Sequence, residues 1–165
     1  MKAQAEEKNH AIDNAKGWMQ TILEDAAALE MDWERFGELK DTDEEDLDDE
    51  EKEELAELKK TATIDGEEFE NADDVRERIE ERPLSIQVRS GWYSPGDDSG
   101  SPEEFEILLS TGGPALRIMG DLDEYGQPTR AYMQWQDWGT PWTDYYESGT
   151  SDALLTWVSV FYFGE

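Results

Sequence analysis

"FEILLSTGGPALRIMGDLDEYGQPTRAYMQWQDW", residues 105–138, is the stretch that decides the fold. Its first run places three apolar side chains on one face of an extended chain, at the period-two spacing of a strand: Phe105, Ile107 and Leu109. Turn-forming residues interrupt the apolar sequence at 112–114 and again at 123–126. Strands joined by such short turns predict an antiparallel meander.

The segments on either side extend this pattern. "LSIQVRS", residues 84–90, alternates apolar and polar residues and predicts a half-buried strand. "SDALLTWVSVFYFGE", residues 151–165, begins with a Ser/Asp cap, and we expect a helix through about Val160. A strand is the alternative there, because residues 158–163 are β-branched and aromatic. The C-terminal half is therefore expected to form a three- to four-stranded antiparallel sheet with a C-terminal helix.

The N-terminal half begins with a heptad pattern. Apolar residues alternate at spacings of three and four over about three and a half heptads: Ile12, Ala15, Met19, Ile22, Ala26, Leu29, Trp33 and Phe36. This spacing predicts one long amphipathic helix. Its apolar seam could pack against the next helix or the sheet, or it could serve as the interface of a homodimer.

"DTDEEDLDDEEKEELAE", residues 41–57, contains twelve Asp or Glu residues among seventeen. Thr42 and Glu45 match a capping box, which predicts the start of a second helix. That helix has only a thin apolar stripe, so we expect it to lie against the first helix as an antiparallel hairpin with most of its surface exposed. "NADDVRERIEERP", residues 71–83, predicts a third helix capped by Asn71.

These elements predict an α+β protein in two parts. Residues 1–62 would form an acidic helical hairpin, and residues 63–165 would form an α+β domain with the third helix and the antiparallel sheet. The composition changes in the same sense: the acids concentrate before Pro83 and most of the aromatic residues follow it.

Charge and composition exclude several functions. The formal net charge of -29, from 43 acids and 14 bases, repels nucleic acids and anionic membranes and attracts basic proteins. The chain has no Cys and a single His, which argues against a zinc site. We expect no metal or cofactor. The first residues lack the apolar core of a signal peptide and no membrane-spanning run occurs, so we expect the protein in the cytoplasm of its host cell.

No catalytic constellation stands out. A Ser-His-Asp triad would need His10 at the start of the first helix, and no phosphate-binding glycine loop is present. With 43 acids, pairs of carboxylates carry no specific information about acid–base chemistry. We therefore expect a protein that is not an enzyme.

Three tryptophans occur close together in the second half: Trp135, Trp138 and Trp142. Such residues either fill a small core or form a contact surface for a protein partner, because Trp is a typical interface anchor. Stacking of nucleic-acid bases would also need a positive groove, and residues 83–165 contain only three bases.

The acidic stretch suggests a working surface. As a helix, seventeen residues would span roughly 25 Å, and twelve carboxylates over that length approach the line charge of duplex DNA. A groove that binds phosphates could accept it, which is the physical basis of DNA mimicry. The predicted partner-binding residues are the three tryptophans and twelve acids: Asp41, Asp43, Glu44, Glu45, Asp46, Asp48, Asp49, Glu50, Glu51, Glu53, Glu54 and Glu57.

A resemblance supports this interpretation. "RPLSIQVRSGWYSPGD", "FEILLSTGGPALRIMGDLDEYGQP" and "QDWGTPWTDYY", which cover most of residues 83–146, resemble small acidic proteins carried by phages and plasmids. In acidity and size the chain also resembles anti-CRISPR and anti-restriction proteins, several of which act as DNA mimics. The resemblance implies an inhibitor of a basic host-defence protein and carries over no specific functional residue.

Two other interpretations remain open at this point. The chain could be an adaptor or structural module that binds its partner through the aromatic half, with the acidic helices serving for solubility or dimerisation. Alternatively, an acidic surface could reflect the salt of a halophilic host. That last interpretation does not explain why the acids crowd into one stretch.

Overall fold

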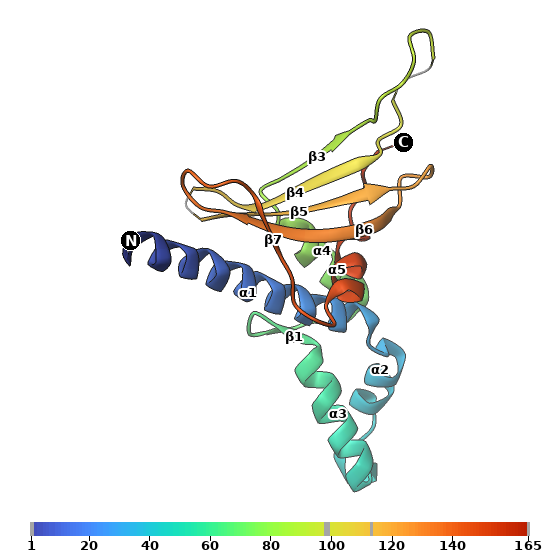
Figure 1. Ribbon diagram of the computed structural model, residues 1–165. Coiled ribbons are helices and arrows are strands. Elements are labelled where there is room, and N and C mark those ends of the chain that lie inside the picture. The colour runs from blue at the N-terminus through green and yellow to red at the C-terminus, as the bar shows by residue number, and fades with distance from the viewer. Residues whose placement is uncertain (1, 98–99, 113, 165) are drawn as a thin grey trace.

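A five-stranded antiparallel sheet forms one layer of the molecule (Figure 1). The computed structural model describes residues 2–97, 100–112 and 114–164. The strands are neighbours in chain order, namely β3 (Ser85–Arg89), β4 (Glu104–Ser110), β5 (Ala115–Leu122), β6 (Pro128–Gln136) and β7 (Thr143–Tyr145). The predicted meander is confirmed. One strand more than expected is present, because β7 pairs with the end of β6. Gly113, in the first predicted turn, lies outside the described residues.

Helices form a second layer beneath the sheet and a projection away from it (Figure 1). The helical segments are α1 (Lys2–Glu30), α2 (Trp33–Asp41), the 3-10 helix η1 (Glu44–Asp46), α3 (Asp49–Thr61), α4 (Ala72–Glu81) and α5 (Ser151–Val158). A small hairpin, β1 (Thr63–Ile64) and β2 (Glu67–Glu68), connects α3 to α4. None of the helices in the described part of the chain is long and apolar enough to cross a membrane.

The core lies between the sheet and α1, α4 and α5. Along β4, Phe105, Ile107 and Leu109 are buried while the residues between them are half-buried, as the alternation predicts. Gly120 on β5 lies opposite Phe105, and its lack of a side chain leaves room for that ring. Side chains from α1, α4 and α5 complete the same hydrophobic cluster.

The predicted long first helix is interrupted after Glu30. Asp32 is an N-cap, since its carboxylate accepts a hydrogen bond of 3.0 Å from the backbone N–H of Arg35, and α2 begins at Trp33. The prediction of one continuous helix through Phe36 was therefore wrong. A heptad count does not detect a cap that ends one amphipathic helix and starts another in a new direction.

The heptad seam packs within the molecule. Ala15, Met19 and Ile22 on α1 are buried in the cluster beneath the sheet, whereas Ile12 is 40% exposed. Because most of the seam is already covered, it does not offer the continuous apolar face that the predicted homodimer would need.

The acidic helix does not lie along the first helix as predicted. It is α3, which packs against α2, and these two helices form the projecting hairpin (Figure 1). The predicted division between residues 62 and 63 does not follow the packing either, because it separates α1 from the sheet with which α1 shares a core. Both differences follow from the break after Glu30, because it separates α1 from α2 and leaves α2 as the helix that pairs with α3.

The two remaining predicted helices are present. Asn71 caps α4, accepting a hydrogen bond of 2.9 Å from the backbone N–H of Asp74. The C-terminal segment is helical, and α5 ends at Val158, two residues before the expected end. The chain then leaves the helix so that Phe161 and Phe163 can return to the core, where the Phe163 ring lies 4.7 Å from that of Phe105.

One buried ion pair joins the helices. The Asp25 carboxylate of α1 is fully buried and accepts hydrogen bonds of 2.7 and 3.0 Å from Arg82, at the end of α4, and of 2.9 Å from the indole N–H of Trp157 on α5. Arg82 also donates to Asp65, in the turn between β1 and β2, at 3.0 Å. Four elements therefore meet at this pair.

The buried carboxylate has a consequence for stability. Burial raises the pKa of Asp25 above its ordinary value, although the hydrogen bonds from Arg82 and Trp157 act in the opposite direction. The folded protein therefore holds a proton at a pH where the unfolded chain has released it. For this group, the free energy of unfolding falls as the pH rises from the ordinary Asp value of about 3.9 through the raised value.

We expect the protein to be more stable at about pH 5 than at about pH 7. Acidification brings the pH closer to the raised pKa of Asp25 and also reduces the repulsion within a chain of charge -29. Glu104 acts in the opposite sense because Arg89 lowers its pKa, but that contribution is lost only below about pH 4.3. Urea unfolding at the two pH values measures the difference, and a lower midpoint at the acidic pH would contradict it.

Candidate functional site

The strongest candidate is the hairpin formed by residues 33–61, which we call the acidic hairpin. Its interior contains three buried apolar side chains, Phe36, Leu39 and Leu47, which lie outside the cluster beneath the sheet. Arg35 on α2 links the two helices, because its guanidinium donates two hydrogen bonds of 3.1 Å to the Glu54 carboxylate on α3. The hairpin thus has a small core and an ion pair of its own, while Trp33 at its start packs against the cluster beneath the sheet.

The connection between α2 and α3 differs from the prediction. Thr42 ends α2 as its C-cap, and its hydroxyl donates to the carbonyl oxygen of Glu38 at 2.8 Å. The capping box lies six residues later: the Asp48 carboxylate accepts from the Glu51 N–H at 2.8 Å, and the Glu51 carboxylate accepts from the Asp48 N–H at 3.4 Å. The predicted box at Thr42 and Glu45 was wrong because burial of Leu47 requires a turn before α3.

The seventeen-residue acidic stretch is therefore not one helical rod. It consists of the last residue of α2, the 3-10 helix η1 with its flanking residues, and the first nine residues of α3. The estimated line charge of a continuous helix does not apply to this shape. The fold instead forms the short acidic hairpin, whose tip, residues 41–51, contains nine acids and no base.

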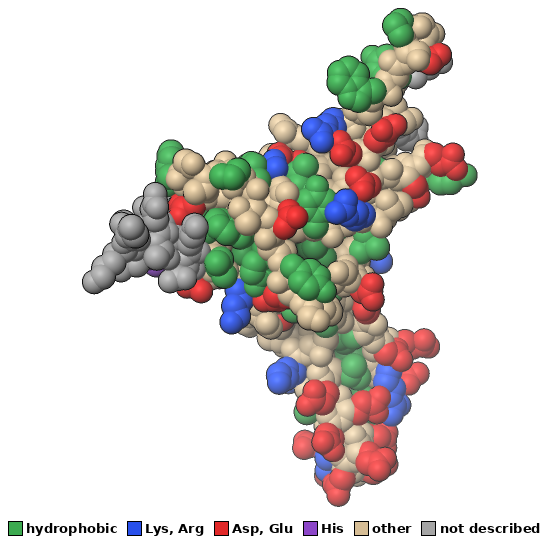
Figure 2. Space-filling view, in the orientation of Figure 1, with side chains coloured by type: hydrophobic (Ala, Val, Ile, Leu, Met, Phe, Trp, Pro, Cys, Tyr) green, Lys and Arg blue, Asp and Glu red, His purple; other side chains and the backbone are tan. Residues whose placement is uncertain are grey.

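Most of the predicted acidic site residues point into solvent. Asp48 and Glu51 cap α3, and Glu54 pairs with Arg35. Within the described part of the chain, the other nine make no side-chain hydrogen bond or ion pair, and all are exposed: Asp41, Asp43, Glu44, Glu45, Asp46, Asp49, Glu50, Glu53 and Glu57. Figure 2 shows acidic side chains dominating the projecting hairpin. The fold leaves these charges free for a partner.

The three predicted tryptophans have different environments. Trp135 on β6 is 8% exposed and belongs to the core, so it is unable to serve as a contact residue. Trp138 follows β6 and is 77% exposed. Trp142 is half-buried, with the Arg117 guanidinium 4.0 Å from its ring centroid. The structure therefore divides this group between core and surface and leaves Trp138 as its exposed member.

A second candidate is the face of the sheet that the helices do not cover. The three arginines of the C-terminal half, Arg89, Arg117 and Arg130, all lie on it. The sequence showed only that this half contains three bases and did not place them on one face. A sequence signal was available, because each arginine occupies a polar position in a strand that alternates polar and apolar residues. The pairing of the strands then brings these polar positions onto one face of the sheet.

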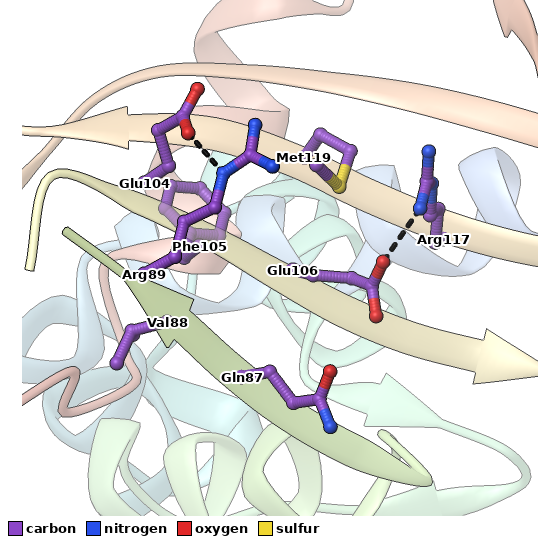
Figure 3. Close-up of a pocket in the computed structure, with 8 residues that line it drawn as sticks. All are labelled: Gln87, Val88, Arg89, Glu104, Phe105, Glu106, Arg117 and Met119. Atoms are coloured by element: carbon purple, nitrogen blue, oxygen red, sulfur yellow. Dashed lines mark hydrogen bonds and ion pairs between the residues drawn. The ribbon is translucent and has the colours of Figure 1, made fainter. Parts of the chain in front are cut away.

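Each of these arginines has an acidic neighbour. Figure 3 shows Arg89 pairing with Glu104, and Arg117 pairing with Glu106, in the shallow hollow between β3, β4 and β5. The Arg117 and Glu106 side chains are 2.6 Å apart. The hydrogen bond from Arg89 lowers the pKa of Glu104 and keeps it ionised. Because the cations are neutralised locally, this face does not offer the positive groove that base stacking requires.

Comparisons of the chain with protein-family models, with curated proteins and with solved structures each find no match. Among the described residues, no group of three or more His, Asp or Glu side chains is arranged to hold a metal ion.

Proposed function

We propose that this protein is a non-enzymatic inhibitor that inserts its acidic hairpin into the basic groove of a nucleic-acid-binding protein. The observation that supports the proposal is the tip of the hairpin, residues 41–51, with nine acids and no base, projecting beyond the core. A cationic groove that holds phosphates would bind these carboxylates by the same charge attraction. A host-defence protein such as a CRISPR effector or a restriction enzyme is the expected class of target.

The shape of the hairpin suits this role. Two packed helices are about 20 Å across when their spacing and side chains are included, which is of the same order as a nucleic-acid duplex. Arg35 and the capping box fix the hairpin before binding, so little conformational entropy is lost when a partner engages it. We therefore propose that the compact acidic hairpin, and not a long continuous helix, imitates the nucleic acid.

The first test is competition with DNA. We expect the purified protein to displace labelled DNA from a target effector at low salt, and to lose affinity steeply as salt is raised from about 50 to about 200 mM, as groove-binding polyanions do. Fluorescence anisotropy of the DNA measures both effects. If the protein displaces DNA from no member of a panel of CRISPR effectors and restriction enzymes, the proposal is wrong.

An adaptor function is the second candidate. It is favoured by the exposure of Trp138 after the end of β6, because an exposed Trp is a typical anchor for a protein partner. In that case Trp138→Ala would abolish partner binding and salt would have little effect. The salt dependence of binding and the effect of Trp138→Ala therefore separate the two functions.

A further inference from the structure

β3 is an edge strand whose outer side has no strand partner in the described part of the chain. It pairs with β4 on one side, and all five of its side chains are exposed. An edge of this kind presents free backbone N–H and C=O groups to another strand, and proteins usually protect it with charges, bulges or a covering element.

The side chains of this edge are apolar on the core face. Ile86 and Val88 lie opposite Ile107 and Phe105 in the register of β3 with β4. The two β4 residues are buried, yet Ile86 is 37% exposed, Val88 is 43% exposed and Leu84 is more exposed still. The helices beneath the sheet therefore end before the edge, and a row of three aliphatic side chains is left uncovered.

The charge around this edge is unusual for the chain. Residues 82–96 contain no Asp or Glu, although the whole sequence contains 43. Two copies of a protein with charge -29 repel each other over most of their surfaces. An acid-free edge is where two copies approach at the lowest electrostatic cost.

We propose that β3 pairs with β3 of a second copy, antiparallel and with the two-fold axis at Ile86. In this register, Leu84 of each copy lies opposite Val88 of the other, and the two Ile86 side chains face each other. All three apolar side chains therefore become less exposed to solvent. Ser85 lies opposite Gln87 on the open face. Arg89 lies opposite Pro83, so the two arginines do not meet. The two sheets become one continuous sheet.

The dimer differs physically from the partner complex proposed above. Salt screens the repulsion between the two acidic chains, so the dimer strengthens as the salt concentration rises. Insertion of the acidic hairpin into a basic groove weakens under the same change. Dimerisation is measured on the purified chain without any partner, and so its failure and the failure of the inhibitor function are distinguishable.

The test is the mass in solution of the protein and two matched variants. Light scattering after gel filtration should give about twice the monomer mass of 18.9 kDa, with a larger dimer fraction at high salt. Ile86→Lys places two like charges opposite each other at the axis and should give a monomer with an unchanged circular dichroism spectrum. Ile12→Lys, at a residue of similar exposure on α1, should remain a dimer.

Cross-linking provides a second measurement that does not depend on the lysine variant. The chain contains no Cys, and facing residues of antiparallel strands have Cα atoms about 4.5–5.5 Å apart, which suits a disulfide. Mild oxidation should therefore link Ile86→Cys into a covalent dimer and leave Ile12→Cys unlinked. A monomer at every salt concentration, or a dimer lost only in Ile12→Lys, would overturn the proposal.

Discussion

Asp25→Ala is expected to lower the free energy of unfolding by about 3 kcal/mol, because it removes one partner of a buried ion pair. The substitution leaves Nε of Arg82 and the indole nitrogen of Trp157 without their acceptor, and it removes one of the two acceptors of the Arg82 Nη2 atom. Asp65 still faces Arg82 and limits the loss. Urea unfolding followed by tryptophan fluorescence and by circular dichroism measures the change.

Two further variants isolate the cause. Asp13→Ala, at an exposed acid on the same helix, should change the free energy of unfolding by less than about 0.5 kcal/mol. The double variant Asp25→Ala/Arg82→Ala should be about 1–2 kcal/mol more stable than the sum of the single variants implies, since each single variant already breaks the shared interaction. Simple additivity would show that the pair is not coupled.

Removal of six charges from the hairpin tip is expected to weaken binding to the basic target on the order of 100-fold. The substitutions are Asp41→Asn, Asp43→Asn, Glu44→Gln, Glu45→Gln, Asp46→Asn and Glu50→Gln. They leave intact Asp48 and Glu51, which cap α3, and Glu54, which pairs with Arg35. The hairpin should therefore remain folded, and the salt dependence of binding should become shallower because fewer charges take part.

A charge-matched variant decides whether position or total charge matters. It removes six exposed acids that lie outside residues 33–61 and that form no ion pair with another described residue: Asp13→Asn, Glu70→Gln, Glu77→Gln, Glu80→Gln, Asp97→Asn and Glu124→Gln. Both variants have the same net charge. If both lose affinity equally, the protein acts through its overall field and the hairpin has no special role.

The sheet could be predicted from local pattern. Alternation along β4 assigns Phe105, Ile107 and Leu109 to one face, and turn-forming residues separate the strands, so neighbouring strands follow chain order. The addition of β7 was not predictable, because its three residues contain no alternation long enough to read. It exists because it pairs with the end of β6.

The candidate site was predicted in composition but not in shape. The acids of the hairpin tip could be identified directly, while their arrangement depended on which of two similar capping boxes forms. Both boxes match the same sequence rule, and the one that forms, at Asp48 and Glu51, follows the buried Leu47. Trp135 and Trp138 are likewise indistinguishable by residue type. Trp135 is buried because its position in β6 faces the core, and Trp138 is exposed because it follows the end of that strand.

Local sequence patterns were enough to predict the α+β class, the meander, the helix cap at Asn71 and the concentration of charge in the N-terminal half; the C-terminal helix was also predicted, but its N-cap is Thr150, which makes no side-chain cap hydrogen bond, and not the expected Ser/Asp cap. Each of these depends on residues that are close along the chain, where spacing and turn chemistry act directly. Long-range packing places α1 under the sheet, makes α2 and α3 project as a hairpin, and leaves β3 as an uncovered edge. These outcomes depend on long-range burial, such as the meeting of Asp25 with Arg82 and Trp157, which no local pattern encodes.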